Sequence, residues 1–404
     1  MNEINSPPTY VPGWSDPDLV KIIPYKQLGR TGMIVSKLGF GCAYLKLDRN
    51  QNSKSLAHPN VEAIQEAIRS GVNLIDTSPF YGQSRSEQCL GEALRDLPRS
   101  SFYLATKVGR HPDCSFDYGT KAVARSLESS LERLNVNHID LVQIHDVEFC
   151  PSLEQLFNET LPVLDQFKRK GIIHHIGITG YPLTILREII EKSPFEIETV
   201  LSYCRHSVWD QSLNDYIPFF QSKNVGIINA ALFGMGLLAE PNDSKSIPSW
   251  HPAPMELRNA CQIASKICRK HRISLKRLAL NHSFQAKEIA TNLIGMETPE
   301  MFRENLSTIL ELLGRRSNQL NIPMEQRDVG IDFDTETMDY FRQQQLKQHR
   351  QQQDQYRKLF DMIQEEIFSK LSSRNWEEIE VRQYRSDPQK FINTLLHSWC
   401  SNDF

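Results

Sequence analysis

Short apolar runs and longer amphipathic stretches alternate along most of the chain. Eight runs have the length and β-branched or aromatic content of buried strands: 36–42, 73–78, 102–109, 138–145, 174–179, 199–204, 225–231 and 292–296. Between them, apolar residues recur with a helical period at 60–70, 86–95, 120–134, 153–169, 182–192, 212–222 and 256–271. Eight alternating strand–helix units over about 270 residues predict an α/β protein with a closed (β/α)8 TIM barrel.

The two ends of the chain are patterned differently from the predicted barrel. Residues 1–24 are proline-rich and weakly patterned, so we expect an N-terminal arm there. A turn at 29–32 between two apolar stretches predicts an N-terminal hairpin at the start of a barrel domain spanning 25–320. Residues 321–404 form a C-terminal extension, expected to be mostly helical or disordered. Its amphipathic faces suit docking on the barrel and binding of a protein partner alike.

Composition and charge exclude several classes of protein. The chain has 46 basic and 49 acidic residues, for a net charge of -3, so it lacks the cationic excess of a nucleic-acid or membrane-surface binder. Its eight cysteines form no C-x-x-C pair, and we predict reduced thiols and no metal site. The N-terminus lacks the pattern of a signal peptide, and the longest apolar run, 226–239, is too short to span a membrane. These features predict a cytoplasmic protein.

Four polar residues stand at or just after the ends of predicted strands. Asp76, Lys107 and His145 end the second, third and fourth strands, and Tyr81 follows Asp76 by five positions. Each residue alone has an ordinary structural explanation, as a helix cap, a surface charge, a buried histidine or a packing residue. Together they lie where barrel enzymes carry their catalytic groups, at the carboxyl ends of the strands. The four therefore favour one acid–base site.

The chemistry of these side chains is complementary. A tyrosine hydroxyl has an ordinary pKa near ~10 and is a poor acid or base at neutral pH. A neighbouring Lys107 ammonium would lower that pKa, and Asp76 would hold the ammonium in place. His145 would orient the substrate oxygen, while Tyr81 exchanges a proton with an alcohol or carbonyl. Hydride transfer to or from that carbon needs a nicotinamide cofactor.

Residues 25–305 resemble the aldo-keto reductase family. The resemblance is carried by LGFGC, NLIDTSPFYGQSRSEQCLGEAL, FYLATKVGR, IDLVQIHD, GIIHHIGITGYP, VGIINAALFGMGLLAE and GMETPEMFRENL. Asp76, Tyr81, Lys107 and His145 match the family's catalytic tetrad. ITGYP, VLSYC and MGLLAE are most similar to the branch of L-galactose and D-arabinose dehydrogenases. The resemblance implies a barrel that binds NAD(P) without a Rossmann glycine loop, and oxidation of an aldose at C1 or reduction of small aldehydes and ketones.

The resemblance also implies a set of cofactor contacts: Gly41, Cys42, Asp76, Thr179, Ser202, Leu232, Gly234, Gly295, Met296, Met301, Glu304 and Asn305. Several positions depart from the family pattern. Thr179-Gly180 and Ser202 stand where the family holds the nicotinamide carboxamide with Ser-Asn and Gln. Ala230 replaces the aromatic residue that stacks on the nicotinamide ring, and Phe233 could compensate for it.

The stretch 295–305 lacks the residues with which the family binds the 2′-phosphate of NADP. Met301 occupies the usual arginine position, and Glu297 adds a negative charge that would repel a phosphate. Arg303 is the nearest cation in the sequence. Glu304 and Asn305 match the residues that reach the adenine. The cofactor is therefore expected to be NAD or NADP, with NAD favoured.

Two other functions remain open at this point. The extension favours a catalytically weak, cofactor-binding scaffold or regulatory subunit with a partner-binding tail, although the complete tetrad argues against a purely non-enzymatic role. A metal-dependent hydrolase would need ligands such as His145-Asp146 or His174-His175. Adjacent residues of a strand point to opposite faces, so His174 and His175 cannot both line one site.

Overall fold

The computed structural model describes residues 6–45, 58–238, 251–315, 335–377 and 379–400. The predicted loop over 240–254 lies outside the described residues except for 251–254. The helix search over the described part of the chain finds no helix long and apolar enough to cross a membrane.

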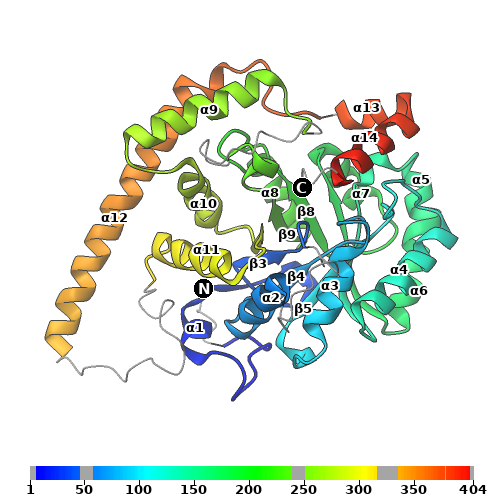
Figure 1. Cartoon of the computed structure of the whole chain (residues 1–404), viewed down its shortest axis with the longest axis horizontal. Coiled ribbons are helices and arrows are strands. Elements are labelled where there is room, and N and C mark those ends of the chain that lie inside the picture. Colours follow the sequence, from blue (N-terminus) through cyan, green and yellow to red (C-terminus); the bar gives the residue numbers. More distant parts are fainter. Residues whose placement is uncertain (1–5, 46–57, 239–250, 316–334, 378, 401–404) are drawn as a thin grey trace.

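Eight parallel strands close into a barrel in the order β10-β3-β4-β5-β6-β7-β8-β9, as predicted (Figure 1). Their bounds are within a few residues of the expected ones: β3 Leu38–Gly41, β4 Leu74–Asp76, β5 Tyr103–Val108, β6 Ile139–Ile144, β7 Ile173–Gly180, β8 Thr199–Tyr203, β9 Gly226–Ala230 and β10 Thr291–Gly295.

The barrel interior is a separate small hydrophobic core closed at one end by the predicted hairpin. Strands β1 (Tyr25–Gln27) and β2 (Ile34–Ser36) pair antiparallel across the short helix η1 (Gly29–Thr31). Strand β2 and the connection between the two strands contribute three buried side chains, Leu28, Met33 and Val35, to an interior layer. The layer is completed by residues from six barrel strands or their flanks: Leu74, Ala105, Leu141, Leu201, Ile228, Ala290 and Leu293. The amino end of the barrel is therefore sealed, and the carboxyl end remains for a site.

Helices surround the barrel and bury their apolar faces against the strands. All seven predicted helices are present. Six of them are α2 Pro59–Arg69, α3 Arg85–Leu94, α4 Thr120–Leu134, α7 Leu183–Lys192, α8 Leu213–Ser222 and α9 Met255–Lys270. The seventh, predicted at 153–169, is a continuous helix with a π-helical segment in it: α5 Leu153–Gln155, η4 Leu156–Thr160 and α6 Leu161–Arg169. The helices α10 Leu275–Gln285 and α11 Pro299–Leu312, which flank β10, were not predicted. Short helices complete the set: η2 Arg99–Ser101, η3 Val147–Phe149 and η5 Gly234–Gly236.

The described part of the predicted arm is more ordered than its sequence pattern indicates. Helix α1 (Pro17–Ile22) begins at Asp16, whose side chain accepts the backbone N–H groups of residues 18 and 19. Leu19 and Ile23 join the main core. This helix has only six residues, so a periodicity argument cannot detect it.

The extension is mostly helical in its described part, which the sequence predicted as one of two outcomes. It consists of α12 Thr335–Glu366, η7 Phe368–Lys370, α13 Ile379–Ser386 and α14 Pro388–Cys400. Figure 1 shows α12, in orange, running along the outside of α9 and α10, and α13 and α14, in red, lying beyond it near α7. The apolar side chains Tyr356, Leu359 and Ile363 of α12 are buried. The predicted amphipathic helix is therefore a packing surface of the barrel.

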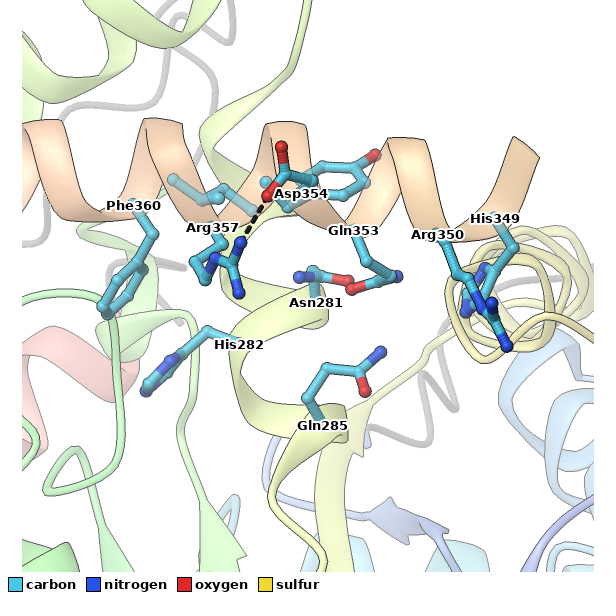
Figure 2. Close-up of a pocket in the computed structure, with 11 residues that line it drawn as sticks. Asn281, His282, Gln285, His349, Arg350, Gln353, Asp354, Arg357 and Phe360 are labelled. Carbon is cyan, nitrogen blue, oxygen red and sulfur yellow. Dashed lines mark hydrogen bonds and ion pairs between the residues drawn. The ribbon is translucent and has the colours of Figure 1, made fainter. Parts of the chain in front are cut away.

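A pocket of ≈ 540 Å³, open to solvent on one side, lies between α12 and α10. Figure 2 shows side chains of both helices facing each other across it. The imidazole of His282 lies between the rings of His206 and Phe360, with centroid distances of 4.5 and 4.6 Å. Burial lowers the pKa of His282 to about 3. The neutral His282 ring of α10 therefore packs against Phe360 of α12 and helps to hold the extension on the barrel.

The packing of α3 on α4 gives a direct test of this fold. A Cβ atom added at Gly91 would lie 2.1 Å from the carbonyl oxygen of Arg133. Gly91→Ala is expected to reduce the free energy of unfolding by about 1–3 kcal/mol because the two helices must separate, measured by urea denaturation. Gly41→Ala is the control, since its nearest neighbour would be 3.4 Å away. Equal stability of the two variants would contradict this packing.

Candidate active site

Three neighbouring strands place their polar residues in one layer at the carboxyl end of the barrel. Leu74, Ala105 and Leu141 face the interior core. Side chains alternate along a strand, so the residues two positions further on, Asp76, Lys107 and Gln143, also face inward, one layer closer to the carboxyl end. The same alternation predicts the inward position of His145.

Asp76 and Lys107 form a buried ion pair at the centre of this layer. Lys107 Nζ lies 2.5 Å from Asp76 Oδ1 and donates to the carbonyl oxygen of Thr77 at 2.9 Å. Gln143 Nε2 donates to the other oxygen of Asp76 at 2.8 Å. Burial alone would lower the pKa of Lys107, but Asp76 and Tyr81 outweigh it and raise that pKa. Lys107 is therefore a permanently charged group with a set orientation.

Tyr81 and His145 stand beside this ion pair. Lys107 Nζ lies 4.7 Å from the centroid of the Tyr81 ring, and the rings of Tyr81 and His145 meet edge to face at 5.8 Å. His145 Nδ1 lies 3.1 Å from Ser78 Oγ. Burial and then the cations Lys107 and Arg110 lower the pKa of His145 far below its usual value. A neutral imidazole can hold a substrate oxygen by a hydrogen bond without adding a charge.

The net shift of the Tyr81 pKa differs in direction from the prediction. Burial is the largest influence and raises this pKa, while Lys107 lowers it by a smaller amount. The sequence identified the effect of Lys107 but contained no measure of how deeply the phenol is enclosed. Tyr81 is consequently protonated at neutral pH and is set up as a proton donor, or as an acceptor at higher pH.

A second charged pair lies next to His145. Arg110 donates to Asp146 Oδ2 at 2.6 Å, and His145 Nε2 lies 3.8 Å from the same oxygen. The Asp146 backbone N–H donates to Thr179 Oγ1 at 3.1 Å. The sequence analysis named Asp146 only as an imagined metal ligand and assigned no role to Arg110 or Gln143. Their closeness in sequence to predicted site residues could have identified them, since Gln143 precedes His145 by two positions and Arg110 follows Lys107 by three.

Of the two predicted carboxamide contacts, Thr179 lies beside the tetrad and its hydroxyl fits such a group, whereas Ser202 faces away. Leu201 faces the interior core, so Ser202 Oγ, which is buried with no hydrogen-bond partner among the described residues, points to the opposite face of β8. The hydroxyl of Thr179 is buried near the end of β7. Its oxygen accepts the Asp146 backbone N–H, and its O–H group can donate to a ligand. Thr179 would hold the carboxamide of a nicotinamide cofactor, whose ring supplies or accepts the hydride when bound.

Other expected cofactor positions lie at neighbouring strand ends. Gly41 ends β3 and Gly295 ends β10, and the two strands pair there. Cys42 and Met296 follow them and are both buried in the hydrophobic core. A cofactor could therefore contact these two residues only through their backbone atoms.

The segment after β9 holds two more of the expected residues. Leu232 is buried in the core, and a Cβ atom at Gly234 would lie 2.3 Å from the indole of Trp209. Phe233 is partly buried, and Lys276 Nζ lies 5.7 Å from its ring centroid. Lys276 was missed by the sequence analysis because it comes from α10, an element that was not predicted.

The remaining expected residues lie on α11. Met301 and Glu304 are exposed, whereas Asn305 is buried and its Oδ1 has no partner among the described residues. Arg303 pairs with both carboxylate oxygens of Glu66 on α2, at 2.6 and 2.7 Å. The Arg303 guanidinium therefore pairs with a carboxylate of α2, away from the carboxyl ends of the strands.

Three residues at the amino end of the barrel group as metal ligands could: His138, Asp140 and His174. Asp140 already accepts hydrogen bonds from Arg99 at 2.5 Å and from the backbone N–H of Leu104 at 2.8 Å. His175 instead pairs with Glu198 at 2.6 Å. The two adjacent histidines thus have different partners, and both are remote from the tetrad at the opposite end of the strands.

Comparison with known proteins identifies the class of protein that this fold and site define. A model of the Aldo/keto reductase family matches residues 37–316. The chain belongs to this family and is an oxidoreductase that uses a nicotinamide cofactor.

Individual relatives are similar over the barrel. L-galactose dehydrogenase of Arabidopsis thaliana is 39% identical over 293 residues, which cover 72% of this chain and 89% of that protein. D-arabinose 1-dehydrogenase of Saccharomyces cerevisiae is 33% identical over 261 residues, covering 62% and 75%. A holo-form aldo-keto reductase from Bacillus halodurans shares the fold, with a TM-score of 0.56 at 23% identity, covering 71% of this chain and 91% of that one. The predicted family and branch are confirmed.

Proposed function

We propose that this protein oxidises the C1 hydroxyl of a cyclic aldose, such as L-galactose or D-arabinose, to the lactone, with NAD preferred over NADP. In the opposite direction it would reduce small aldehydes and ketones. The observation that carries the proposal is the buried Asp76–Lys107 pair beside Tyr81, with neutral His145 across the same space. The two sugar dehydrogenases among the relatives support the choice of substrate.

Each residue of the tetrad has one task in this reaction. The C1–H and O–H bonds of the sugar break as the C1=O bond forms, and the hydride leaves to the cofactor. Tyr81 takes the hydroxyl proton, and His145 positions the oxygen by a hydrogen bond. Lys107 stabilises the phenolate form of Tyr81, and Asp76 with Gln143 keeps Lys107 in position.

The proposal is tested by assaying the purified chain with L-galactose and D-arabinose and following formation of reduced cofactor. The matched control is the 1,5-anhydro form of each sugar, which lacks the C1 hydroxyl and should not react. Reduction of aldehydes without any oxidation of either aldose would contradict the choice of substrate while leaving the oxidoreductase class intact.

The preference for NAD predicts the effect of one substitution on α11. Met301→Arg introduces a guanidinium at an exposed position, and a phosphate would gain a charge-assisted hydrogen bond. We expect NADPH to bind about tenfold more tightly than to the unmodified chain, with NADH little changed. Met301→Gln is the control for size without charge. Tighter binding of NADPH than NADH by the unmodified chain, measured by fluorescence titration, would contradict the preference.

A protein partner of the extension would use its exposed residues, which include 385–390 of α13 and α14 and a stretch of α12. Residues 343–348 are exposed, and Leu346 is an exposed large apolar side chain within them. A partner-binding role of the extension would use these two exposed stretches.

A further inference from the structure

The second half of the extension lies over the candidate active site, although the family match ends at residue 316. We call residues 376–395, without 378, the mouth segment. It comprises Trp376, Glu377, α13 and the first part of α14. Its contacts are with residues that follow β5, β6, β7 and β8, which are the strands around the tetrad.

Trp376 attaches one end of the mouth segment to the carboxyl end of the barrel. Its indole is buried and stacks on the ring of Tyr181 at a centroid distance of 4.8 Å and an angle of 12°. Tyr181 directly follows the last residue of β7 and also contacts the ring of Tyr203 at 5.3 Å. Arg205 joins this contact, with its guanidinium 4.9 Å from the Tyr181 ring and 3.4 Å from Glu377.

Two aromatic residues attach the other end of the mouth segment. Tyr384 lies 5.0 Å from Phe116 and 5.6 Å from Phe149, and Phe391 lies 6.0 Å from Phe149, between ring centroids. Phe149 belongs to η3, four residues after His145. Such aromatic contacts stabilise the packing of the mouth segment on the barrel.

Glu380 lies between these two attachments and faces the charged groups next to His145. Its carboxylate interacts with Arg110 and with Asp146, the pair that stands 3.8 Å from the His145 imidazole. Burial and the neighbouring Asp146 raise the pKa of Glu380 to about 7, with Arg110 opposing them. Because Glu380 is only half-buried, its carboxylate can still accept hydrogen bonds from donors of a ligand.

A polyhydroxylated substrate would supply those donors. Ligand sites combine apolar and aromatic walls with a few polar groups that set orientation. Here the walls are Tyr181, Tyr203 and Trp376, and the polar groups are Arg110, Asp146 and Glu380. Arg110 can donate to a substrate oxygen, and the two carboxylates can accept from hydroxyls.

We propose that the mouth segment forms the outer wall of the substrate pocket and that Glu380 hydrogen-bonds a hydroxyl of the substrate. Selectivity for hydroxylated substrates would then depend on a segment outside the region matched by the family. This inference rests on the proposed function for the identity of the sugar, but it applies equally to carbonyl reduction.

The test compares two aldehydes that differ in their hydroxyls, D-glyceraldehyde and propanal, as substrates of the full-length protein. Glu380→Gln keeps the shape of the side chain and removes its charge. We expect kcat/KM for glyceraldehyde to fall about tenfold through KM, with propanal turnover and NADH binding unchanged. Glu366→Gln, an exposed position on α12 of the same extension, is the matched control and should change nothing.

Two other results would overturn the proposal. An unchanged ratio of glyceraldehyde to propanal would show that Glu380 does not contact substrate. A rise in kcat/KM for both aldehydes would mean that the mouth segment is an inhibitory cover. If Glu380→Gln does not fold, Glu380→Asp, which retains the charge on a shorter side chain, is measured for the same ratio. If no aldose is oxidised by the unmodified protein, the proposed sugar substrate fails, but the two aldehydes still decide the role of Glu380.

Discussion

Tyr81→Phe should lower the rate of sugar oxidation and of carbonyl reduction by a factor of about 10³ to 10⁴, the usual upper range for loss of a positioned general acid or base. Binding of NADH should be unchanged, because the substitution removes only the hydroxyl. The ring remains in its edge-to-face contact with His145 and near Lys107. Steady-state kinetics together with fluorescence titration of the cofactor separate the two effects.

The control for this variant is Tyr25→Phe. Tyr25 donates its hydroxyl to the Gly71 carbonyl oxygen at 3.0 Å, away from the tetrad, so its loss should leave kcat unchanged. In the unmodified protein, oxidation should accelerate as pH rises, since burial raises the pKa of Tyr81 above its usual value and phenolate forms only under alkaline conditions. Activity of Tyr81→Phe close to that of the unmodified protein would refute the assigned role.

Lys107→Met should both abolish turnover and destabilise the barrel. Removing one member of a buried ion pair leaves the other charge unpaired, which typically costs about 3–5 kcal/mol. For a domain of this size we expect the thermal-unfolding midpoint to fall by about 5–10 °C. Asp76 is the charge left behind, and its remaining side-chain partner is Gln143.

A second substitution distinguishes the structural effect from the catalytic one. Adding Asp76→Asn to Lys107→Met removes the stranded charge and should restore much of the lost stability without restoring activity. Lys192→Met is the control for lysine removal, because Lys192 pairs with Glu188 on the surface of α7 and such pairs contribute little. Equal midpoints for the single and double variants would contradict a buried pair at this site.

The sequence predicted most of the barrel because the relevant patterns are local. Strand and helix periodicity needs only a window of several residues, and all eight strands were found this way. The position of Asp76 and Lys107 at the carboxyl ends of predicted strands then grouped them in one site before any distance was known. The search for periodic patterns missed α1, which is too short for a period, and also α10, which carries Lys276, and α11.

The tertiary structure alone decided where the extension lies and how deeply the site is enclosed. The backbone N–H of Trp376 donates to the hydroxyl of Tyr181, 195 positions earlier in the chain, and no local pattern links the two residues. Amphipathic periodicity identifies a face that must be covered but contains no information about which surface covers it. The same applies to the pKa of Tyr81, whose direction depends on burial by residues distant in sequence. Local sequence patterns are therefore sufficient to predict the barrel and the four candidate residues at its strand ends, whereas the position of residues 376–395 depends on packing between distant parts of the chain.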